Sequence, residues 1–353
     1  MYKLSLREYK NQSFEIIFIM LGDACNFKCR YCLQGNHENK IVPPVFSQNM
    51  LSFLDSYPSD NTMLSFWGGE PLLYFNSIKK LVERYKNKFH YEMVSNGSLL
   101  TEEIVTFLNK YNINFNLSHD GKDTSETRLI DVLIDKHTKS LFEKINNRAV
   151  NVTITSISPS MKELFEYYPI DCAVNINTMI NTTDTEISRI YASFNYDKYK
   201  QDIQYLLQSY EDYLSGDKSK WREAKNVSRM MGSFQAFLNE GRTRNRCFAC
   251  GHGKKMLNMD ANGDFYICHN SKTKIGSVKE GLDAAASKLD KILKKTGQKC
   301  EICEIKDYCS GSCFMLNGYG EKQNCEMLKH FYQIFLSWLI EAKKRWENKA
   351  NIS

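Results

Sequence analysis

The chain has 353 residues and a formal net charge of +6, and 42% of its residues are hydrophobic and 25% charged. These values are ordinary for a globular protein, and the length is sufficient for two domains with a large core. No apolar run approaches the roughly 20 residues that span a bilayer, and the polar N-terminus lacks the apolar stretch of a signal peptide. We therefore exclude a membrane protein and expect the chain to stay in the cytoplasm.

Apolar, strand-like runs alternate with amphipathic helical stretches through the first half of the chain. Helical spacing over residues 77–88 and 101–110 separates neighbouring runs, which is typical of repeated βα units and a parallel sheet. The six candidate strands are residues 14–21, 62–67, 91–95, 113–117, 150–157 and 172–180. Residues 199–240 then turn helical, and apolar residues between Leu328 and Ala342 recur at helical spacing. We expect this last helix to cover a core rather than to dock a partner.

Three cysteines stand close together directly after the first apolar run. Cys25, Cys29 and Cys32 offer three soft thiolate ligands within eight residues, which suits a 4Fe–4S cluster held in a loop at the end of a buried strand. Three thiolates leave one of the four irons open to another ligand. A zinc knuckle is the alternative, but it needs four ligands and usually two C-x2-C pairs.

The spacing C-x3-C-x2-C, with the aromatic Tyr31 before the last cysteine, resembles the signature of radical S-adenosylmethionine (SAM) enzymes. The resemblance implies an α/β fold with a partial (β/α)6 TIM-like barrel. It implies that SAM binds the open iron and is cleaved to a 5′-deoxyadenosyl radical, which takes a hydrogen atom from the substrate. The protein would orient the reactants and exclude water. A flavodoxin or ferredoxin-type protein would supply the electron.

A glycine-rich turn follows the second strand and resembles the segment that holds the amino group of SAM. Gly68 and Gly69 would let the backbone approach a ligand closely, and Glu70 offers acceptors to an ammonium group. Such a turn standing alone would be no more than a turn. Its position about 35 residues after the cysteine loop favours the SAM-binding role.

The fourth strand ends in Ser118-His119-Asp120-Gly121, which resembles the family's S-x-D-G segment, whose serine approaches SAM. Arg128 falls where relatives place an arginine that pairs with the SAM carboxylate, a contact that suits a guanidinium. His119 stands where the family usually has an apolar residue. We expect it to be a surface histidine rather than a catalytic one.

Three further residues correspond to SAM contacts in relatives, and each has a plain structural alternative. Asn96 and Ser156 lie at strand ends, where they would contact the methionine and ribose parts or would form turns. Tyr31 would pack near the adenine or would belong to the core.

The remaining cysteines gather in the last third of the chain, and in a reducing compartment so many argue for metal ligation over disulfides. Their order resembles the SPASM domain, the auxiliary-cluster extension of radical SAM enzymes that modify peptides and proteins. The matching set is Cys250, Gly263, Cys268, Cys300, Cys303, Cys309, Cys313 and Cys325. Four closely spaced cysteines of this set would also make a zinc ribbon, which is the alternative. Cys172, alone in an apolar run, is expected in the core.

The resemblance implies two auxiliary 4Fe–4S clusters, and therefore three clusters in all. The first would take Cys250, Cys268 and Cys313, and Cys247 would complete it or stay a structural thiol. The second would take Cys300, Cys303, Cys309 and Cys325. With about eleven thiolates on three clusters the net charge falls to roughly +1. The basic formal charge is thus no argument for nucleic acid.

These observations divide the chain into four parts. We predict a radical SAM partial barrel over residues 1–198, a helical bridge over 199–245, a SPASM domain over 246–326 and a C-terminal helix over 327–353.

The SPASM resemblance implies a peptide substrate. The local sequence after Cys250, and His269 directly after Cys268, look more like maturases of ribosomally made peptides, which form thioether or carbon–carbon crosslinks. Sulfatase-maturing enzymes, the alternative, carry an aspartate at the place of His269. His269 is a candidate base, or it supports a cluster from outside. Some 13 residues precede the first strand, so we expect leader-peptide recognition elsewhere or in a separate protein. A non-catalytic electron carrier is the alternative of another class.

Overall fold

The computed structural model describes residues 14–34, 40–58, 61–179, 193, 195–240, 255–296, 302–306, 309 and 318–350. The six predicted strands are present and pair in parallel, in the order in which they follow one another along the chain. They are β1 (Ile16–Met20), β2 (Met63–Trp67), β3 (His90–Ser95), β4 (Asn114–Ser118), β5 (Arg148–Ile154) and β6 (Ala173–Thr178). The predicted α/β fold with six parallel strands is confirmed.

Three more strands lengthen the same sheet beyond β1. The strand β7 (Met256–Asp260) pairs in parallel with β1, and β8 (Asp264–Tyr266) and β9 (Lys274–Ser277) add to it in antiparallel order. The part of the chain predicted as a separate cysteine-rich domain therefore begins by extending the sheet of the barrel. The described strands follow the order β6-β5-β4-β3-β2-β1-β7-β8-β9.

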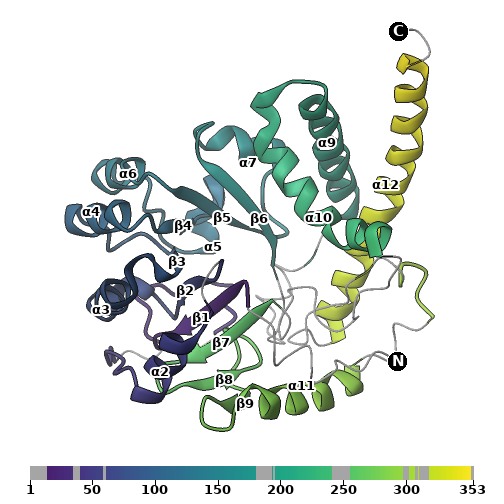
Figure 1. Ribbon diagram of the computed structural model, residues 1–353. Coiled ribbons are helices and arrows are strands. Elements are labelled where there is room, and N and C mark those ends of the chain that lie inside the picture. The colour runs from purple at the N-terminus through teal and green to yellow at the C-terminus, as the bar shows by residue number, and fades with distance from the viewer. Residues whose placement is uncertain are drawn as a thin grey trace.

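Helices cover the convex side of the curved sheet (Figure 1). They are α2 (Gln48–Ser56), α3 (Phe75–Tyr85), α4 (Glu102–Lys110), α6 (Lys136–Glu143) and α7 (Met161–Tyr167). Local sequence sets their ends: Thr101 accepts from the backbone N–H of Ile104 at the start of α4, and Ser160 and Glu163 form a capping box on α7. Short helices η1 (Pro71–Tyr74), η2 (Lys86–Lys88), η3 (Gly121–Asp123) and α5 (Thr124–Thr127) complete this half.

The two faces of the sheet differ in polarity, because successive side chains of a strand point to opposite faces. Leu64, Phe66, Tyr91, Met93, Phe115 and Leu117 face the helices and are at most 2% exposed. The side chains between them are mostly polar and lie on the concave face: Ser65, Glu92, Asn116, Asn151 and Asn175. Cys172 is fully buried, as predicted. The concave face is therefore the polar one.

Two long helices follow β6 and flank its edge. They are α9 (Tyr196–Leu214) and α10 (Trp221–Glu240), joined by η4 (Lys218–Lys220). The described part of the predicted bridge is thus helical, and its role as a bridge between two domains stays a prediction. The amide of Asn226 ties α10 to β6: it donates to the carbonyl of Val174 at 2.7 Å and accepts from the N–H of Ile176 at 3.1 Å. This contact places α10 beside β6, along the edge of the sheet.

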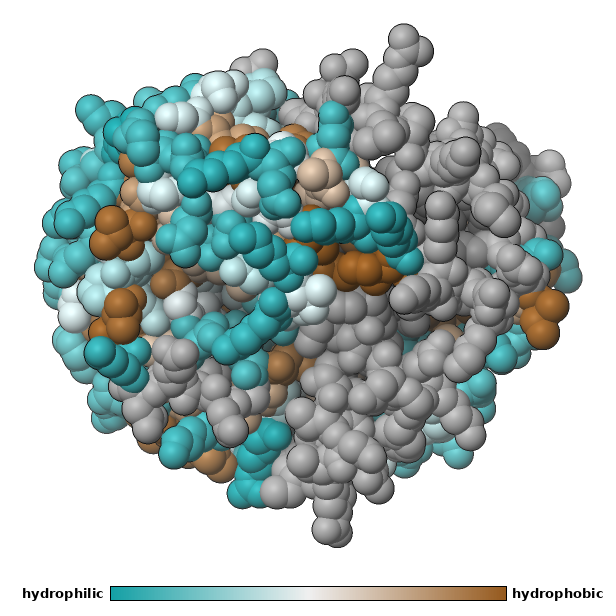
Figure 2. Space-filling model, turned by 90° about the horizontal axis from the view of Figure 1, so that it is seen from below, coloured by the Kyte–Doolittle hydropathy of each residue, from teal (hydrophilic) through white to brown (hydrophobic). Residues whose placement is uncertain are grey.

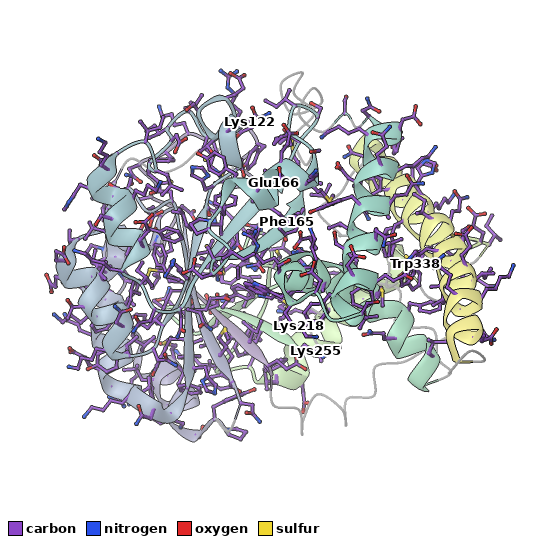
Figure 3. All side chains as sticks on the ribbon, turned by 90° about the horizontal axis from the view of Figure 1, so that it is seen from above. Lys122, Phe165, Glu166, Lys218, Lys255 and Trp338 are labelled. Atoms are coloured by element: carbon purple, nitrogen blue, oxygen red, sulfur yellow. The ribbon has the colours of Figure 1, made fainter. Side chains whose placement is uncertain are left out.

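The chain ends in α11 (Leu282–Thr296) and the long helix α12 (Gly318–Ala350). Phe331, Tyr332 and Phe335 of α12 are buried, so the helix covers a core as predicted. It starts at Gly318 rather than near residue 327. Trp338 on α12 reaches α9, where its indole N–H donates to Glu211 at 3.3 Å (Figure 3).

Where residues are coloured on the surface seen from below, most are hydrophilic and the apolar ones form small patches (Figure 2). Within the described residues, none of the helices combines the length and the apolar character that crossing a bilayer requires.

Candidate functional site

The cysteine loop, residues 22–32, leaves β1 at the carboxyl end of the sheet, and the turn after β2 lies directly against it. The N–H of Gly69 donates to the carbonyl of Gly22 at 2.9 Å, and the N–H of Glu70 donates to that of Ala24 at 2.8 Å. A Cβ on Gly69 would lie 2.2 Å from the carbonyl oxygen of Ala24, and one on Gly68 would lie 2.7 Å from that of Gly22. The two glycines are thus required by the approach of this turn to the cysteine loop.

Glu70 joins this turn to β3. Its carboxylate is 1% exposed and accepts from the N–H of Leu72 at 3.0 Å, the hydroxyl of Ser95 at 2.7 Å and the N–H of Asn96 at 2.8 Å. Burial raises the pKa of Glu70, and these hydrogen bonds counteract part of the rise. The structure therefore places Glu70 inside the protein, where it holds the carboxyl ends of two strands together.

The first half of the cysteine loop is fixed by Asn96. The amide of Asn96 donates to Oδ1 of Asn26 at 2.9 Å, and Asn26 in turn donates to the hydroxyl of Ser98 at 2.8 Å. Ser98 closes the triangle, because its hydroxyl donates to Oδ1 of Asn96 at 2.7 Å. Asn26 was not among the predicted site residues, although its position between Cys25 and Cys29 indicated that it belongs to the cysteine loop.

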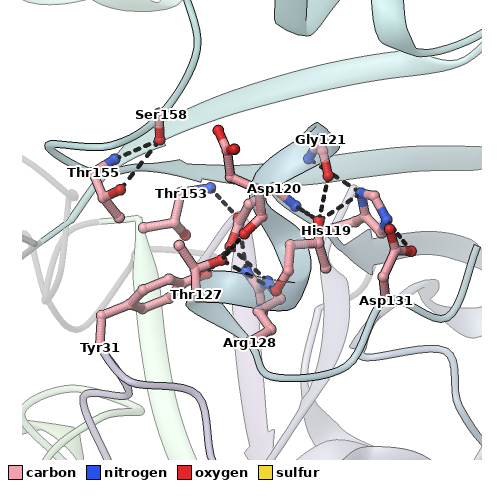
Figure 4. Close-up of polar contacts among 12 residues, drawn as sticks. Tyr31, His119, Asp120, Gly121, Thr127, Arg128, Asp131, Thr153, Thr155 and Ser158 are labelled. Carbon is pink, nitrogen blue, oxygen red and sulfur yellow. Dashed lines mark hydrogen bonds and ion pairs between the residues drawn. The ribbon is translucent and has the colours of Figure 1, made fainter.

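The second half of the loop is fixed by Asp120, whose carboxylate is fully buried (Figure 4). It accepts five hydrogen bonds: from the hydroxyl of Tyr31 at 2.5 Å, the hydroxyl of Thr127 at 2.7 Å, the N–H of Thr153 at 2.9 Å, and Arg128 at 3.0 and 3.2 Å. The bonds from Arg128 arrive at both carboxylate oxygens, which is the strong bidentate arrangement. Asp120 thus connects β4, β5 and the cysteine loop.

Arg128 lies between Asp120 and the cysteines. Its guanidinium lies 5.3 Å from the centre of the Tyr31 ring, and the residue is 8% exposed. Burial raises the pKa of the Cys29 thiol, and the neighbouring charge of Arg128 opposes the rise. Burial also raises the pKa of Cys25 to about 11. Binding of iron to these thiols must therefore release protons.

The three cysteines suit a cubane cluster by the chemistry of their side chains. All three are half-buried thiols on one loop. In such a cluster each thiolate binds a different iron, and three thiolates leave the fourth iron open.

His119 contradicts the prediction of a surface histidine, because it is fully buried. Its Nε2 lies 2.8 Å from Asp131, and its Nδ1 lies 2.8 Å from the hydroxyl of Tyr168 and 3.1 Å from that of Thr124. A polar ring is stable there because both nitrogens have partners. Asp131 lies in the loop before α6, and no sequence signal indicated this pairing.

The two predicted serines lie at the same edge of the sheet. Ser118 ends β4 and Ser156 follows β5, and both are half-buried. Their positions are compatible with contacts to a ligand above the carboxyl ends of these strands.

The second cysteine group is described only in part. Cys268, Cys303, Cys309 and Cys325 are half-buried, and Cys325 lies within α12. The four other predicted ligands lie outside the described residues: Cys247, Cys250, Cys300 and Cys313. The zinc and cluster alternatives for this group both stay predictions.

His269 follows Cys268 and lies at the edge of a pocket. Its ring centre is 4.2 Å from that of Phe18 and 4.2 Å from that of Trp67, and its Nδ1 lies 3.3 Å from Oδ1 of Asn258. The pocket has a volume of about 530 Å³ and is lined by His269, Trp67, Gly68, Gly22, Asp23 and residues 42–45. It therefore opens where the cysteine loop, the glycine turn and the β7–β8 hairpin meet.

Residues 19–194 match the sequence profile of the radical SAM superfamily. The chain contains a radical SAM domain. The domain spans β1 to β6, with the cysteine loop, Glu70, Asn96, Asp120 and Arg128. Membership implies that the enzyme uses SAM and a 4Fe–4S cluster.

Two curated relatives match nearly the whole chain. The radical SAM cyclopropyl synthase TigE of Paramaledivibacter caminithermalis is 24% identical, over 94% of this chain and 75% of TigE. The serine-type anaerobic sulfatase-maturating enzyme of Klebsiella aerogenes is 21% identical, over 92% of this chain and 85% of that enzyme. The radical SAM domain of this chain thus resembles those of enzymes with different products.

Solved structures show the same fold. Native anSMEcpe with bound AdoMet and Cp18Cys peptide aligns with a TM-score of 0.68 at 18% identity, over 94% of this chain and 99% of that one. SuiB of Streptococcus suis, bound to the precursor peptide SuiA, aligns with a TM-score of 0.57 at 18% identity, over 88% of this chain and 74% of SuiB. The predicted TIM-like radical SAM fold is confirmed.

Proposed function

We propose that this radical SAM enzyme oxidatively modifies a ribosomally made precursor peptide, with a thioether or carbon–carbon crosslink as the product. The observation that carries the proposal is the pocket of about 530 Å³, which shares Gly22, Asp23 and Gly68 with the cysteine loop and its supporting turn. Two neighbours of the same fold, anSMEcpe and SuiB, were solved with peptides bound. A peptide segment in this pocket would lie beside the site of radical formation.

The residues of the barrel would divide the work between two tasks. Cys25, Cys29 and Cys32 would ligate the cluster, while Asn96 and Asp120 hold the two halves of their loop. Ser118, Ser156, Arg128 and the backbone of Gly68 and Gly69 would contact SAM, with Tyr31 packed near them. The chemistry that these residues would hold in place is radical formation from bound SAM, which would supply the hydrogen abstraction. The cysteine loop would be held for this chemistry against the buried strand ends by its contacts with Asn96 and Asp120.

The remaining cysteines would hold two auxiliary clusters. These clusters would receive the electron that the substrate radical gives up. Cys268, Cys303, Cys309 and Cys325 are half-buried thiols, as ligands of such clusters would be. Cys268 directly precedes His269, and His269 lines the pocket. The SPASM assignment thus links the substrate pocket to an electron acceptor within one segment of chain.

His269 is the candidate base of the reaction. Phe18 and Trp67 lie against its ring, its Nδ1 lies 3.3 Å from Oδ1 of Asn258, and the residue lines the pocket. This position is compatible with accepting a proton from a substrate in the pocket.

Anaerobic reconstitution with iron, sulfide, SAM and a reductant tests the proposal. Peptides encoded by short open reading frames beside the gene are added, and products are followed by mass spectrometry. We expect 5′-deoxyadenosine and a peptide that has lost two hydrogen atoms per crosslink. Absence of 5′-deoxyadenosine in fully reconstituted protein would refute the enzyme and favour an electron carrier.

Sulfatase maturation is the second candidate, and the Klebsiella relative favours it. A sulfatase-derived peptide with serine or cysteine at the target position separates the two functions. A product that reacts with a hydrazide would reveal the aldehyde of a sulfatase-maturing enzyme, whereas a crosslinked peptide does not react.

A further inference from the structure

A short apolar segment forms one wall of the pocket beside the cysteine loop. Residues 42–45, with the sequence Val-Pro-Pro-Val, all line this pocket. Val42 is 56% exposed and Val45 is 84% exposed. Single exposed apolar side chains are ordinary on a protein surface, but consecutive ones on the wall of a pocket indicate a binding surface. We call residues 42–45 the apolar wall.

The apolar wall is anchored to the rest of the protein at its carboxyl end. Phe46 packs against the core. The N–H of Ser47 donates to the carbonyl of Ala261 at 2.9 Å, and its hydroxyl donates to the carbonyl of Asn262 at 2.8 Å. Both acceptors lie between β7 and β8 and also line the pocket. The segment is therefore fixed to the opposite side of the same pocket.

The apolar wall is also stiff. Each of its two successive prolines has a fixed φ angle, which leaves the segment few alternative conformations. A surface that is already formed loses little conformational entropy when a ligand binds. The wall is thus suited to select a ligand by shape and polarity.

The charged side chains that line the pocket are engaged by other groups of the protein. Nζ of Lys272 lies 2.7 Å from Oδ2 of Asp23. The carboxylate of Asp260 accepts from the N–H of Asn262 at 2.9 Å and from the hydroxyl of Tyr266 at 3.1 Å. A charged group of a ligand would have to displace one of these contacts or enter without a counter-charge, which is unfavourable. The pocket therefore favours an uncharged group.

Building on the proposed function, we propose that the apolar wall binds a large apolar side chain of the precursor peptide, such as leucine, isoleucine or phenylalanine. Met20 and Trp67 line the same pocket, and its volume of about 530 Å³ is in the range of sites that hold groups of this size. Burying such a side chain is favourable, whereas an acidic or basic one would lose its hydration without gaining a partner. Since Gly22 and Gly68 also line the pocket, this side chain would lie near the peptide residue that is modified.

A binding test that needs no reaction uses blocked pentapeptides Gly-Gly-X-Gly-Gly, with Leu, Phe, Ala, Glu or Lys at X. Saturation-transfer NMR with the anaerobically reconstituted protein detects weak ligands and shows which of their protons touch the protein. Wild type is compared with a double variant that carries Val42→Asn and Val45→Asn. Ile170→Asn is the matched control, because Ile170 is 54% exposed and precedes β6 at the amino edge of the sheet, away from the pocket. All three substituted side chains are exposed, so the midpoint of urea unfolding should not change.

We expect saturation of the Leu and Phe side chains by wild type and by the Ile170 variant, and a decrease of at least about threefold with the double variant, because burial of the side chain is lost. Ala, Glu and Lys at X should give little saturation with any of the proteins. Equal signals for wild type and the double variant would overturn the inference. Saturation of Glu or Lys as strong as that of Leu would overturn it as well.

The precursor peptide that wild type modifies provides a second test. Each large apolar residue of the peptide is replaced by alanine in turn, and KM and kcat are measured with wild type and with the double variant. At one position we expect alanine to raise KM about tenfold for wild type and hardly at all for the double variant, because both changes remove the same contact. The value of kcat should change little.

The outcomes separate the inference from the proposed function. Additive effects on KM at every position of the peptide would overturn the inference and leave the proposed function intact. If wild type modifies no peptide while the pentapeptides behave as expected, the proposed function fails and the site for an apolar side chain stands.

Discussion

The hydroxyl of Tyr31 donates to Oδ2 of Asp120 at 2.5 Å and thereby joins the cysteine loop to the carboxyl end of β4. The same carboxylate holds Arg128, whose guanidinium lies over the Tyr31 ring. Three residues that the sequence assigns to SAM binding are thus bonded to one another. Their contacts hold the second half of the cysteine loop against the carboxyl end of β4.

Replacing Asp120 should weaken both the fold and the retention of iron. Asp120→Asn removes the charge that pairs with the buried Arg128, and leaving such a charge unpaired costs about 3–5 kcal/mol. We expect a lower free energy of unfolding in urea and less iron per chain after reconstitution. Glu126→Gln on α5 is the control, since its carboxylate is half exposed and lies 3.8 Å from Arg30. Comparable losses in both variants would show that the Asp120 contacts have no special role.

Gly69→Ala should be poorly tolerated for a steric reason. The added methyl carbon would lie 2.2 Å from the carbonyl oxygen of Ala24, which is backbone and cannot turn away. We expect destabilisation of about 3 kcal/mol or more, measured by thermal unfolding. Gly232→Ala on α10 meets no atom within 4 Å and should be neutral or slightly stabilising, because alanine favours a helix. Equal melting temperatures for the two variants would contradict the close contact.

Iron content separates the cysteine groups. Wild-type protein reconstituted under anaerobic conditions should contain about twelve irons per chain, and alanine at Cys25, Cys29 and Cys32 together should leave about eight. The measurement is iron and zinc analysis of desalted protein. About four irons with bound zinc in wild type would refute the two auxiliary clusters while leaving the radical SAM cluster in place.

The His119–Asp131 pair should make stability depend on pH at the acid side. Burial alone would raise the pKa of Asp131, but the hydrogen bond and charge of His119 hold it below its ordinary value. A carboxyl with a lowered folded-state pKa stabilises the protein above its unfolded pKa, and the effect disappears as the pH falls through the folded pKa. The stability difference between wild type and Asp131→Asn should thus be full near pH 6 and shrink below about pH 4. A pH-independent difference, measured by urea unfolding, would contradict the pairing.

The strands were predictable because each apolar run must bury itself on the helix side of the sheet. Residues such as Leu64 and Phe66 leave little choice of register or face. The extension of the sheet by β7 was not predictable, since its pairing with β1 joins Ile16 to Met256 across the length of the barrel. Short strands carry too little local pattern to select so distant a partner.

The site was predictable at its cysteines and less so around them. The spacing of Cys25, Cys29 and Cys32 indicated the cluster loop, because three thiolates within eight residues can all reach one cluster. The hydrogen-bond partners of Glu70 and Asp120 depend on how three strand ends meet, which no local pattern records. The prediction that His119 lies on the surface was wrong for the same reason. Its partner Asp131 lies in a loop whose position depends on the packing of the strands.

Hydrogen transfer from the peptide tests the central proposal most directly. A precursor peptide deuterated at its candidate positions is incubated with the reconstituted enzyme, unlabelled SAM and reductant, and the 5′-deoxyadenosine is analysed by mass spectrometry. We predict that 5′-deoxyadenosine gains one deuterium in proportion to the peptide that is modified. Two results would contradict the account. One is a modified peptide whose 5′-deoxyadenosine carries no deuterium, whichever position of the peptide is deuterated. The other is cleavage of SAM that leaves every peptide unchanged.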